Sequence, residues 1–130
     1  MPEVEKALVT ILKADSAVAA LVVTRVFFAD APQTPPVPFI LMTRIGTQYV
    51  HSLNSNAGLS RARIQLDCYA KTQKEARSVG QAVKDAIDTF RGTNSDVIIQ
   101  GVLLLDSMDG YDESPELRRV TQDYHVWYNE

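Results

Sequence analysis

The sequence predicts an α+β fold: an antiparallel or mixed β-sheet of about four to five strands, with an N-terminal helix pair and one long central helix packed on it. Two observations lead to this prediction. Apolar residues recur at helical spacing near the N-terminus and again in the middle of the chain. The remaining segments alternate between apolar and polar residues, which is typical of strands with one buried face. With 130 residues, the chain is expected to form one domain, residues 1–130.

The first third of the chain predicts two short helices and a strand. Residues 3–13 place apolar side chains on one helical stripe. Asp15 and Ser16 are suited to cap a second helix that continues to Leu21. A brief strand is expected at residues 25–28. The proline-rich residues 31–38 can neither continue a helix nor donate regularly to a sheet, so they predict an extended connection.

The clearest prediction is a strand followed by the central helix. Residues 61–69 alternate strictly, with Cys68 among the apolar positions. Thr72 and Glu75 fit a capping box, and Gly92 is placed to end the helix in the left-handed conformation. The apolar stripe of this helix is Ala76, Val79, Val83, Ile87 and Phe90.

Further strands and loops are predicted on both sides of this unit. Residues 39–49 and 117–128 are expected to form strands, and the polar residues 51–58 a loop or hairpin tip. Residues 97–105 are almost continuously apolar, which predicts a strand that is central or buried on both faces. The acidic residues 109–116 predict a loop.

Composition excludes several classes of protein. The net charge of −3, with both signs scattered, is not that of a protein whose main task is to hold nucleic acid. No apolar run approaches the roughly 20 residues of a membrane span. The acidic N-terminus does not resemble a secretion signal. A single cysteine permits no internal disulfide, so the fold is expected to rest on packing.

Neither a metal site nor a cofactor site is expected. Cys68 lies among apolar residues, which favours a reduced core thiol over a nucleophile. His51 and His125 lack the neighbouring ligands that a metal site needs. The chain also has no glycine-rich phosphate loop and no GxSxG motif.

Two carboxylates on predicted polar faces leave two interpretations. If their strands are neighbours, Asp67 and Asp123 form an acid–base dyad. Alternatively, they pair across strands with Arg61, Arg63 or Arg119 and hold the register of the sheet. We favour the structural interpretation and expect no enzyme.

Large aromatic residues on the same polar faces indicate an interaction surface. Tyr69 and Trp127 belong to the residue types that are enriched at protein interfaces, although both rings can also be covered within the subunit. The predicted subunit-interface residues are Arg61, Arg63, Asp67, Tyr69, Arg119, Asp123 and Trp127. The predicted docking-loop residues are Gln48, Tyr49, His51, Asn54, Asn56, Asp109, Tyr111, Asp112, Glu113 and Glu116.

Several segments together resemble the small tail-completion, or tail-terminator, proteins of long-tailed bacteriophages and prophages, a family formerly recorded as a domain of unknown function. The matching segments are residues 12–21, 25–27, 38–40, 61–70, 90–92, 99–101, 119–120 and 123–128. One departure is Val22-Val23-Thr24, where relatives often carry a Gly-Asp turn before the position of Arg25.

The resemblance implies a structural virion protein, assembled in the cytoplasm of the bacterial host. Such a protein forms a ring, typically hexameric, that caps the tail tube at its head-proximal end. The ring stops polymerisation of the tail-tube protein and offers a surface to the head connector or neck proteins. DNA passes through the lumen without specific binding, which suits the mildly acidic balance. Unpaired sheet edges are suited to such ring-closing contacts.

Three alternatives remain open beside the tail terminator. A head–tail connector or neck adaptor differs from it in the partner that it binds. A small hydrolase or nuclease would need Asp67, Asp123 and His125 to converge in one pocket. A monomeric binding module would use the face of Tyr69 and Trp127 for a peptide or another ligand.

Overall fold

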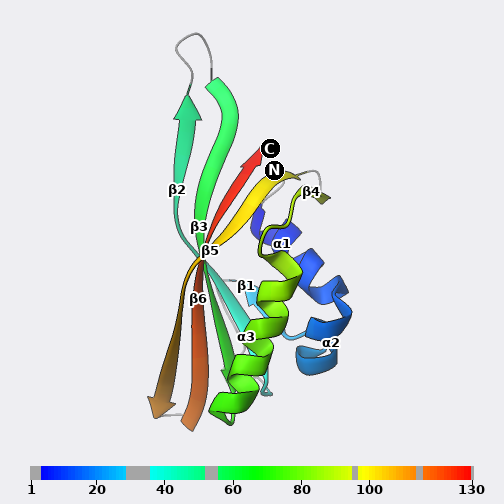
Figure 1. Ribbon diagram of the computed structural model, residues 1–130, viewed down its shortest axis with the longest axis vertical. Helices are drawn as coiled ribbons and strands as arrows, with labels where there is room; N and C mark the ends of the chain where they lie inside the picture. The colour runs from blue at the N-terminus through cyan, green and yellow to red at the C-terminus, as the bar shows by residue number, and fades with distance from the viewer. Residues whose placement is uncertain (1–3, 29–35, 52–55, 95–96, 114–115, 130) are drawn as a thin grey trace.

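The computed structural model describes residues 4–28, 36–51, 56–94, 97–113 and 116–129, and these form three helices and six strands (Figure 1). The helices are α1 (Val4–Ala14), α2 (Ser16–Val22) and α3 (Gln73–Ile87). The strands are β1 (Val26–Phe28), β2 (Phe39–His51), β3 (Asn56–Ala70), β4 (Gly92–Asn94), β5 (Val97–Glu113) and β6 (Glu116–Asn129).

The strands make one mixed, curled sheet in the order β1-β2-β3-β6-β5-β4. β1 is parallel to β2, and every other neighbouring pair is antiparallel. The α+β class is therefore confirmed, but the expected four to five strands were too few. The strand missing from the prediction is β4, which pairs Gly92, Thr93 and Asn94 with the start of β5. Its three residues are too few to show an alternating pattern. Their extended backbone depends on pairing with β5 rather than on their own side chains.

The helices cover one face of the sheet, called here the helix face (Figure 1). α3 packs on β6 and β3, and α1 packs on α2, α3 and β1. The helix face of β3 carries Ala62, Ile64, Leu66 and Cys68, all fully buried. The opposite face, called the open face, carries no helix in the described part of the chain (Figure 1). None of the three described helices is long and apolar enough to cross a membrane.

The start of each capped helix is confirmed, whereas the end of α3 differs from the prediction. Asp15 accepts the backbone N–H groups of Ala17 and Val18, and Thr72 Oγ1 accepts that of Glu75 at 3.2 Å. α3 ends at Ile87 rather than near Gly92, so the central helix is shorter than expected.

Contacts with β5 explain why α3 stops early. The Asp88 carboxylate accepts the N–H of Leu104 at 3.0 Å, and the Thr89 N–H donates to the Val102 carbonyl at 2.9 Å. Thr89, with φ of 65°, therefore takes the left-handed position expected of Gly92. Such long-range bonds leave no mark in the helical periodicity.

The turn between α2 and β1 places a β-branched residue in an unusual backbone conformation. Val23 has φ of 59°, a region that glycine adopts freely and that a β-branched residue rarely enters. The turn before Arg25 therefore carries local backbone strain at Val23.

The hairpin tip predicted at residues 51–58 and the loop predicted at residues 109–116 do fall at strand connections, but the strands extend further into both segments than expected. Residues 52–55 and 114–115 lie outside the described residues. Gln48, Tyr49 and His51 belong to β2, and Asn56 belongs to β3. Asp109, Tyr111, Asp112 and Glu113 belong to β5, and Glu116 to β6. Asn54 lies outside the described residues. Asp, Asn and Gly disfavour strands locally, but continuous pairing with the adjacent strand sustains the extended backbone here.

β5 is neither central nor buried on both faces. It lies one strand from the sheet edge, and the three-residue β4 pairs only with its first three residues. Ile98, Leu103 and Leu105 are each more than two-fifths exposed. The apolar run at residues 97–105 therefore includes side chains that stay exposed to solvent in the single chain.

Candidate functional site

The open face gathers all the predicted interface residues in two adjacent columns along β3 and β6. The register places Arg61 opposite Trp127, and Tyr69 opposite Arg119. Asp123 lies opposite Gln65. The alternation of the sequence therefore correctly predicted which residues share this face, since residues two apart on a strand point to the same side.

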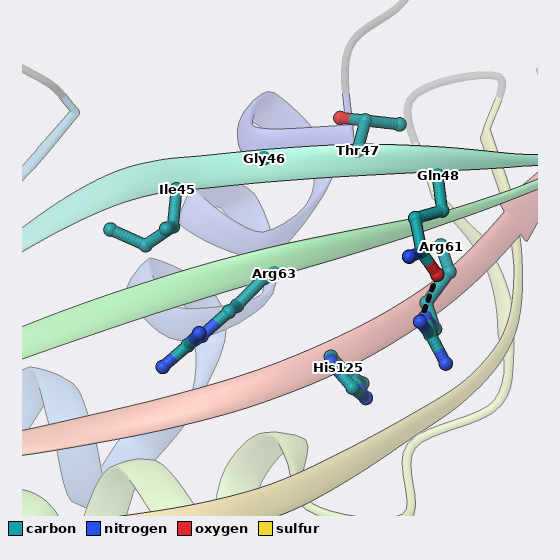
Figure 2. Close-up of a pocket in the computed structure, with 7 residues that line it drawn as sticks. All are labelled: Ile45, Gly46, Thr47, Gln48, Arg61, Arg63 and His125. Atoms are coloured by element: carbon teal, nitrogen blue, oxygen red, sulfur yellow. Dashed lines mark hydrogen bonds between the residues drawn. The ribbon is translucent and has the colours of Figure 1, made fainter.

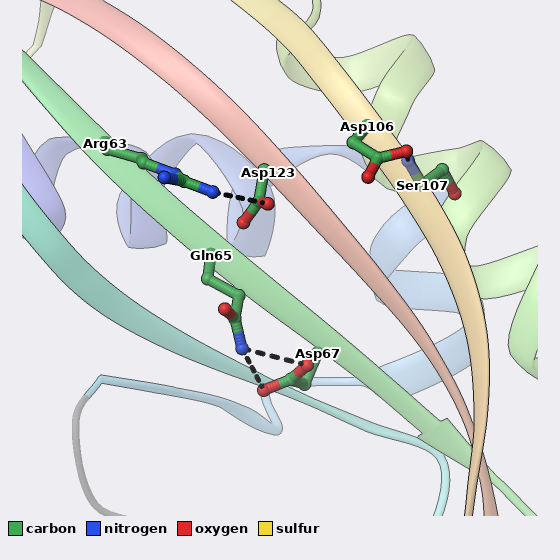
Figure 3. A network of polar contacts seen from close by, with 6 residues as sticks. All are labelled: Arg63, Gln65, Asp67, Asp106, Ser107 and Asp123. Atoms are coloured by element: carbon green, nitrogen blue, oxygen red, sulfur yellow. Dashed lines mark hydrogen bonds and ion pairs between the residues drawn. The ribbon is translucent and has the colours of Figure 1, made fainter.

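A polar network joins the middle of these columns (Figure 3). Arg63 pairs with Asp123 at 3.1 Å, as the cross-strand interpretation predicted. Asp67 accepts hydrogen bonds from the Thr121 hydroxyl at 2.7 Å and from the Gln65 amide at 3.2 Å. No hydrogen bond in the described part joins the two carboxylates to each other. The arrangement is that of residues that hold strand register, not of an acid–base dyad.

Both aromatic residues are half-buried by neighbours of their own subunit. The Tyr69 ring stacks on Phe39 with centroids 4.7 Å apart and an interplanar angle of 18°. The Trp127 ring meets His125 edge to face at 5.7 Å. Each ring is thus fixed in place while part of its surface stays exposed.

A basic hollow of about 400 Å³ lies between β2, β3 and β6 (Figure 2). Arg61 donates to the Gln48 side-chain oxygen. Burial lowers the pKa of His125 below its usual value, and the positive charges of Arg61 and Arg63 lower it further. The lining residues are Ile45, Gly46, Thr47, Gln48, Arg61, Arg63 and His125. Two guanidinium groups beside a neutral imidazole suit a carboxylate or another anion.

At the end of the sheet that carries the β5–β6 hairpin, Arg118 lies on the helix face and Arg119 on the open face. The Arg118 guanidinium lies 4.2 Å from the centroid of the Tyr111 ring. Arg119 lies against Gly110, where an added Cβ would come within 2.9 Å of its guanidinium. A side chain at residue 110 would therefore require the flexible end of Arg119 to move.

The residues proposed for catalysis do not converge. In the described part of the chain, no hydrogen bond links His125 to Asp67 or Asp123, and no group of three His, Cys, Asp or Glu residues is placed to hold a metal ion. Cys68 is fully buried, and burial raises the pKa of its thiol, which disfavours the nucleophilic thiolate.

Sequence reasoning missed three exposed aliphatic residues in β2 and β5. Ile45 is 50% exposed, Leu105 is 43% exposed and Met108 is 59% exposed. Ile45 and Leu105 are the extra residues of two β-bulges, in β2 and β5. For Ile45 the sequence did contain a signal of the bulge, because this residue interrupts the alternation of β2 just before Gly46.

Comparison with known proteins now identifies the family. The model of the family described as "Tail completion protein gp17" matches residues 6–129. The chain belongs to this tail completion family. The resemblance seen in the sequence is therefore confirmed, and this tail completion protein is a structural protein of the virion tail.

A solved structure shares the fold of the tail completion protein. It is a chain from the virion of a native gene transfer agent particle, with a TM-score of 0.82 and 18% sequence identity. The match covers 97% of this chain and 94% of that one. A search among curated proteins finds no match.

Proposed function

We propose that this tail completion protein is a tail terminator, acting as one domain that closes with its copies into a hexameric ring. The ring caps the tail tube at its head-proximal end, stops addition of further tail-tube protein, and joins the tail to the head connector. Such a protein works by surface complementarity and needs neither a cofactor nor a catalytic group. The observation that carries the proposal is the state of the sheet edges.

Both outer strands of the sheet are too short to cover their neighbours. β1 pairs with β2 only at Ile40, Leu41 and Met42. β4 pairs with β5 only from Val97 to Ile99. In the described residues, no strand pairs with the outer edge of the remainder of β2 or of β5. Long open edges invite pairing with another chain, and a head-to-tail contact between different edges generates a ring when the rotation closes.

The two hairpins supply surfaces for two different partners. The β2–β3 hairpin and the β5–β6 hairpin lie at opposite ends of the long sheet (Figure 1). In a ring whose axis follows the strands, one hairpin end would meet the tail tube and the other the head connector. The open-face residues, fixed by their own network, would provide contacts within the assembly or toward the lumen. DNA would pass through that lumen without specific binding, in keeping with the net charge of −3.

Tail-tube growth offers the direct test of this function. Purified protein added to polymerising tail-tube protein is expected to shorten the tubes and to label one end of each tube in electron micrographs. The reason is that a closed ring covers the edge to which the next tube subunit would add. Unchanged tube lengths, together with binding to the portal or connector, would instead identify a neck adaptor, the closest competing function.

A further inference from the structure

The two sides of the sheet are open at different levels. On one side, β4 and the residues after α3 bond to the outer edge of β5 up to Leu104. In the described residues, β5 has no outer partner from Leu105 to Glu113. On the other side, β1 pairs with Ile40–Met42 of β2, and the described stretch from Thr43 to His51 has no outer partner. Each side of the sheet is therefore covered over one half and open over the other.

The short strands β1 and β4 lie at complementary levels, which rows of paired residues across the sheet define. β1 lies level with the open part of β5. Their common row consists of Phe28, Met42, Leu66, Gln122 and Ser107. β4 lies level with the open part of β2. Their common row consists of Thr93, Ile98, Asn129, Leu59 and Val50. When two copies stand side by side, β4 of one and β1 of the next can therefore share one strand position between β5 and β2.

The strand directions fit the same arrangement. β1 is parallel to β2. Three successive antiparallel pairings make β2, and hence β1, antiparallel to β5. In a ring whose axis follows the strands, rotation about the axis keeps the level and the direction of every strand. β1 of the next copy therefore meets the open part of β5 as an antiparallel neighbour.

A hollow of about 320 Å³ lies on the helix face beside the open part of β5. It forms because α3 packs chiefly on β6 and β3, which leaves this part of β5 uncovered. Leu104 and Val120 give the hollow apolar surface, and Ser107 also lines it. Arg77 and Lys84 of α3 add positive charge. An aromatic ring suits such a site, since it combines apolar surface with a face that attracts cations.

Exposed apolar side chains lie on both edges that this arrangement brings together. Phe28 of β1 is 41% exposed, and its row places it on the helix face, level with the hollow. Met108 of β5 is 59% exposed on the open face, and its row begins at Phe27 of β1. Apolar side chains exposed at sheet edges favour association with another chain.

We propose that β1 of one copy pairs antiparallel with the open part of β5 of its neighbour and places Phe28 in the neighbour's hollow. Phe28 then lies opposite Ser107 on the helix face. On the open face, Phe27 lies opposite Met108, where thioether and ring make a favourable contact. The proposal rests on the ring of the proposed function and names its contact.

The positions of Phe28 and the hollow determine the symmetry of the contact. They lie at opposite edges of one sheet, so each copy offers a ring at one edge and a hollow at the other. Such a contact between different edges is head-to-tail and generates a ring rather than a two-fold dimer. A two-fold pair of β5 edges would instead bring Asp106 and Asp109 of both copies together, and like charges destabilise a strand pair.

Cysteine cross-linking on the open face tests the joint and leaves Phe28 in place. The double variant Phe27→Cys/Met108→Cys, oxidised with tail-tube protein present, is expected to give a ladder of covalent oligomers that ends at the closed ring. A mixture of the two single variants should give dimers only, and either single variant alone should give none. Cys68 can stay because it is fully buried. A disulfide needs Cα atoms within about 7 Å, which paired positions of adjacent strands satisfy.

Phe28→Ala tests the hollow separately. Removing an aromatic anchor from a buried pocket of an interface typically weakens association by a factor of about ten or more. The protein concentration at which half of the chains are in rings is therefore expected to rise about tenfold or more, as measured by native mass spectrometry of a dilution series. Rings as stable as those of the unchanged protein would overturn the placement of Phe28 in the hollow.

A matched control uses Leu103, an exposed aliphatic residue on the same face of β5 as Met108. Phe27→Cys/Leu103→Cys is expected to give no ladder, since residues 103 and 108 lie on the order of 15 Å apart along the strand. A ring detected by native mass spectrometry without the Phe27–Met108 ladder would overturn the proposed joint and leave the terminator function standing. Cross-linking of either single variant with itself would overturn the head-to-tail contact. Absence of any ring, with and without tail-tube protein, would overturn the proposed function as well.

Discussion

Replacing Tyr124 by alanine is expected to lower the free energy of unfolding by about 3–5 kcal/mol, the typical cost of removing a buried aromatic side chain. Tyr124 is fully buried on the helix face of β6, in the row that connects all four long strands. Its hydroxyl donates to the Gln122 side-chain oxygen at 2.8 Å, and the Gln122 amide donates to the Gly80 carbonyl of α3 at 2.9 Å. The substitution therefore leaves a cavity and also breaks the link between the sheet and α3. Urea denaturation of the purified variant measures the loss.

Tyr124→Phe separates the two contributions. It keeps the ring and removes only the hydroxyl, which leaves the Gln122 oxygen without this donor, so a loss of about 1–3 kcal/mol is expected. If alanine and phenylalanine cost the same, the ring does not fill the core, and the packing described for this row is wrong.

Replacing Arg44 by alanine is expected to cost about 3 kcal/mol. Arg44 of β2 forms an ion pair with Glu5 of α1, whose carboxylate is almost fully buried. Loss of the guanidinium leaves a buried carboxylate without this partner, and breaking buried pairs in this way typically costs about 3–5 kcal/mol. The lower end applies because the Arg44 side chain is 31% exposed. Chemical denaturation at neutral pH measures this loss too.

The double variant Glu5→Leu/Arg44→Met is the matched control for the ion pair. Removing both charges and keeping the volume is expected to restore most of the stability, since apolar replacements of buried ion pairs are often neutral. A double variant as unstable as Arg44→Ala would show that packing of the arginine stem, and not the unpaired carboxylate, determines the cost. Both variants also change the residue directly before the bulge at Ile45, which belongs to the open edge of β2.

Features that depend on local sequence could be predicted, and features that depend on distant partners could not. The caps at Asp15 and Thr72 follow from side chains that satisfy nearby backbone groups, and both were found. The early end of α3 depends on bonds from Asp88 and Thr89 to β5, far along the chain. The acidic part of β5 looked like a loop because its residues disfavour strands, yet pairing with β6 keeps it extended.

The same division holds for the candidate surface. Strict alternation correctly placed Arg63 and Asp123 on one face, where they pair. It did not reveal that Arg61 contacts Gln48 instead of a carboxylate, since strand order is not encoded in the period of a single strand. The open edges were invisible for a related reason. An edge is defined by which strand is missing beside it, and only the assembled sheet of the described residues shows that β1 and β4 are so short.

Native mass spectrometry of the purified protein, alone and with tail-tube protein, tests the central claim most directly. If copies of this chain close into a terminator ring through their sheet edges, the spectrum is expected to show a hexamer, at the latest when tail-tube protein is present. A strictly monomeric mass at high protein concentration, unchanged by tail-tube protein, would contradict the claim and favour a monomeric binding module.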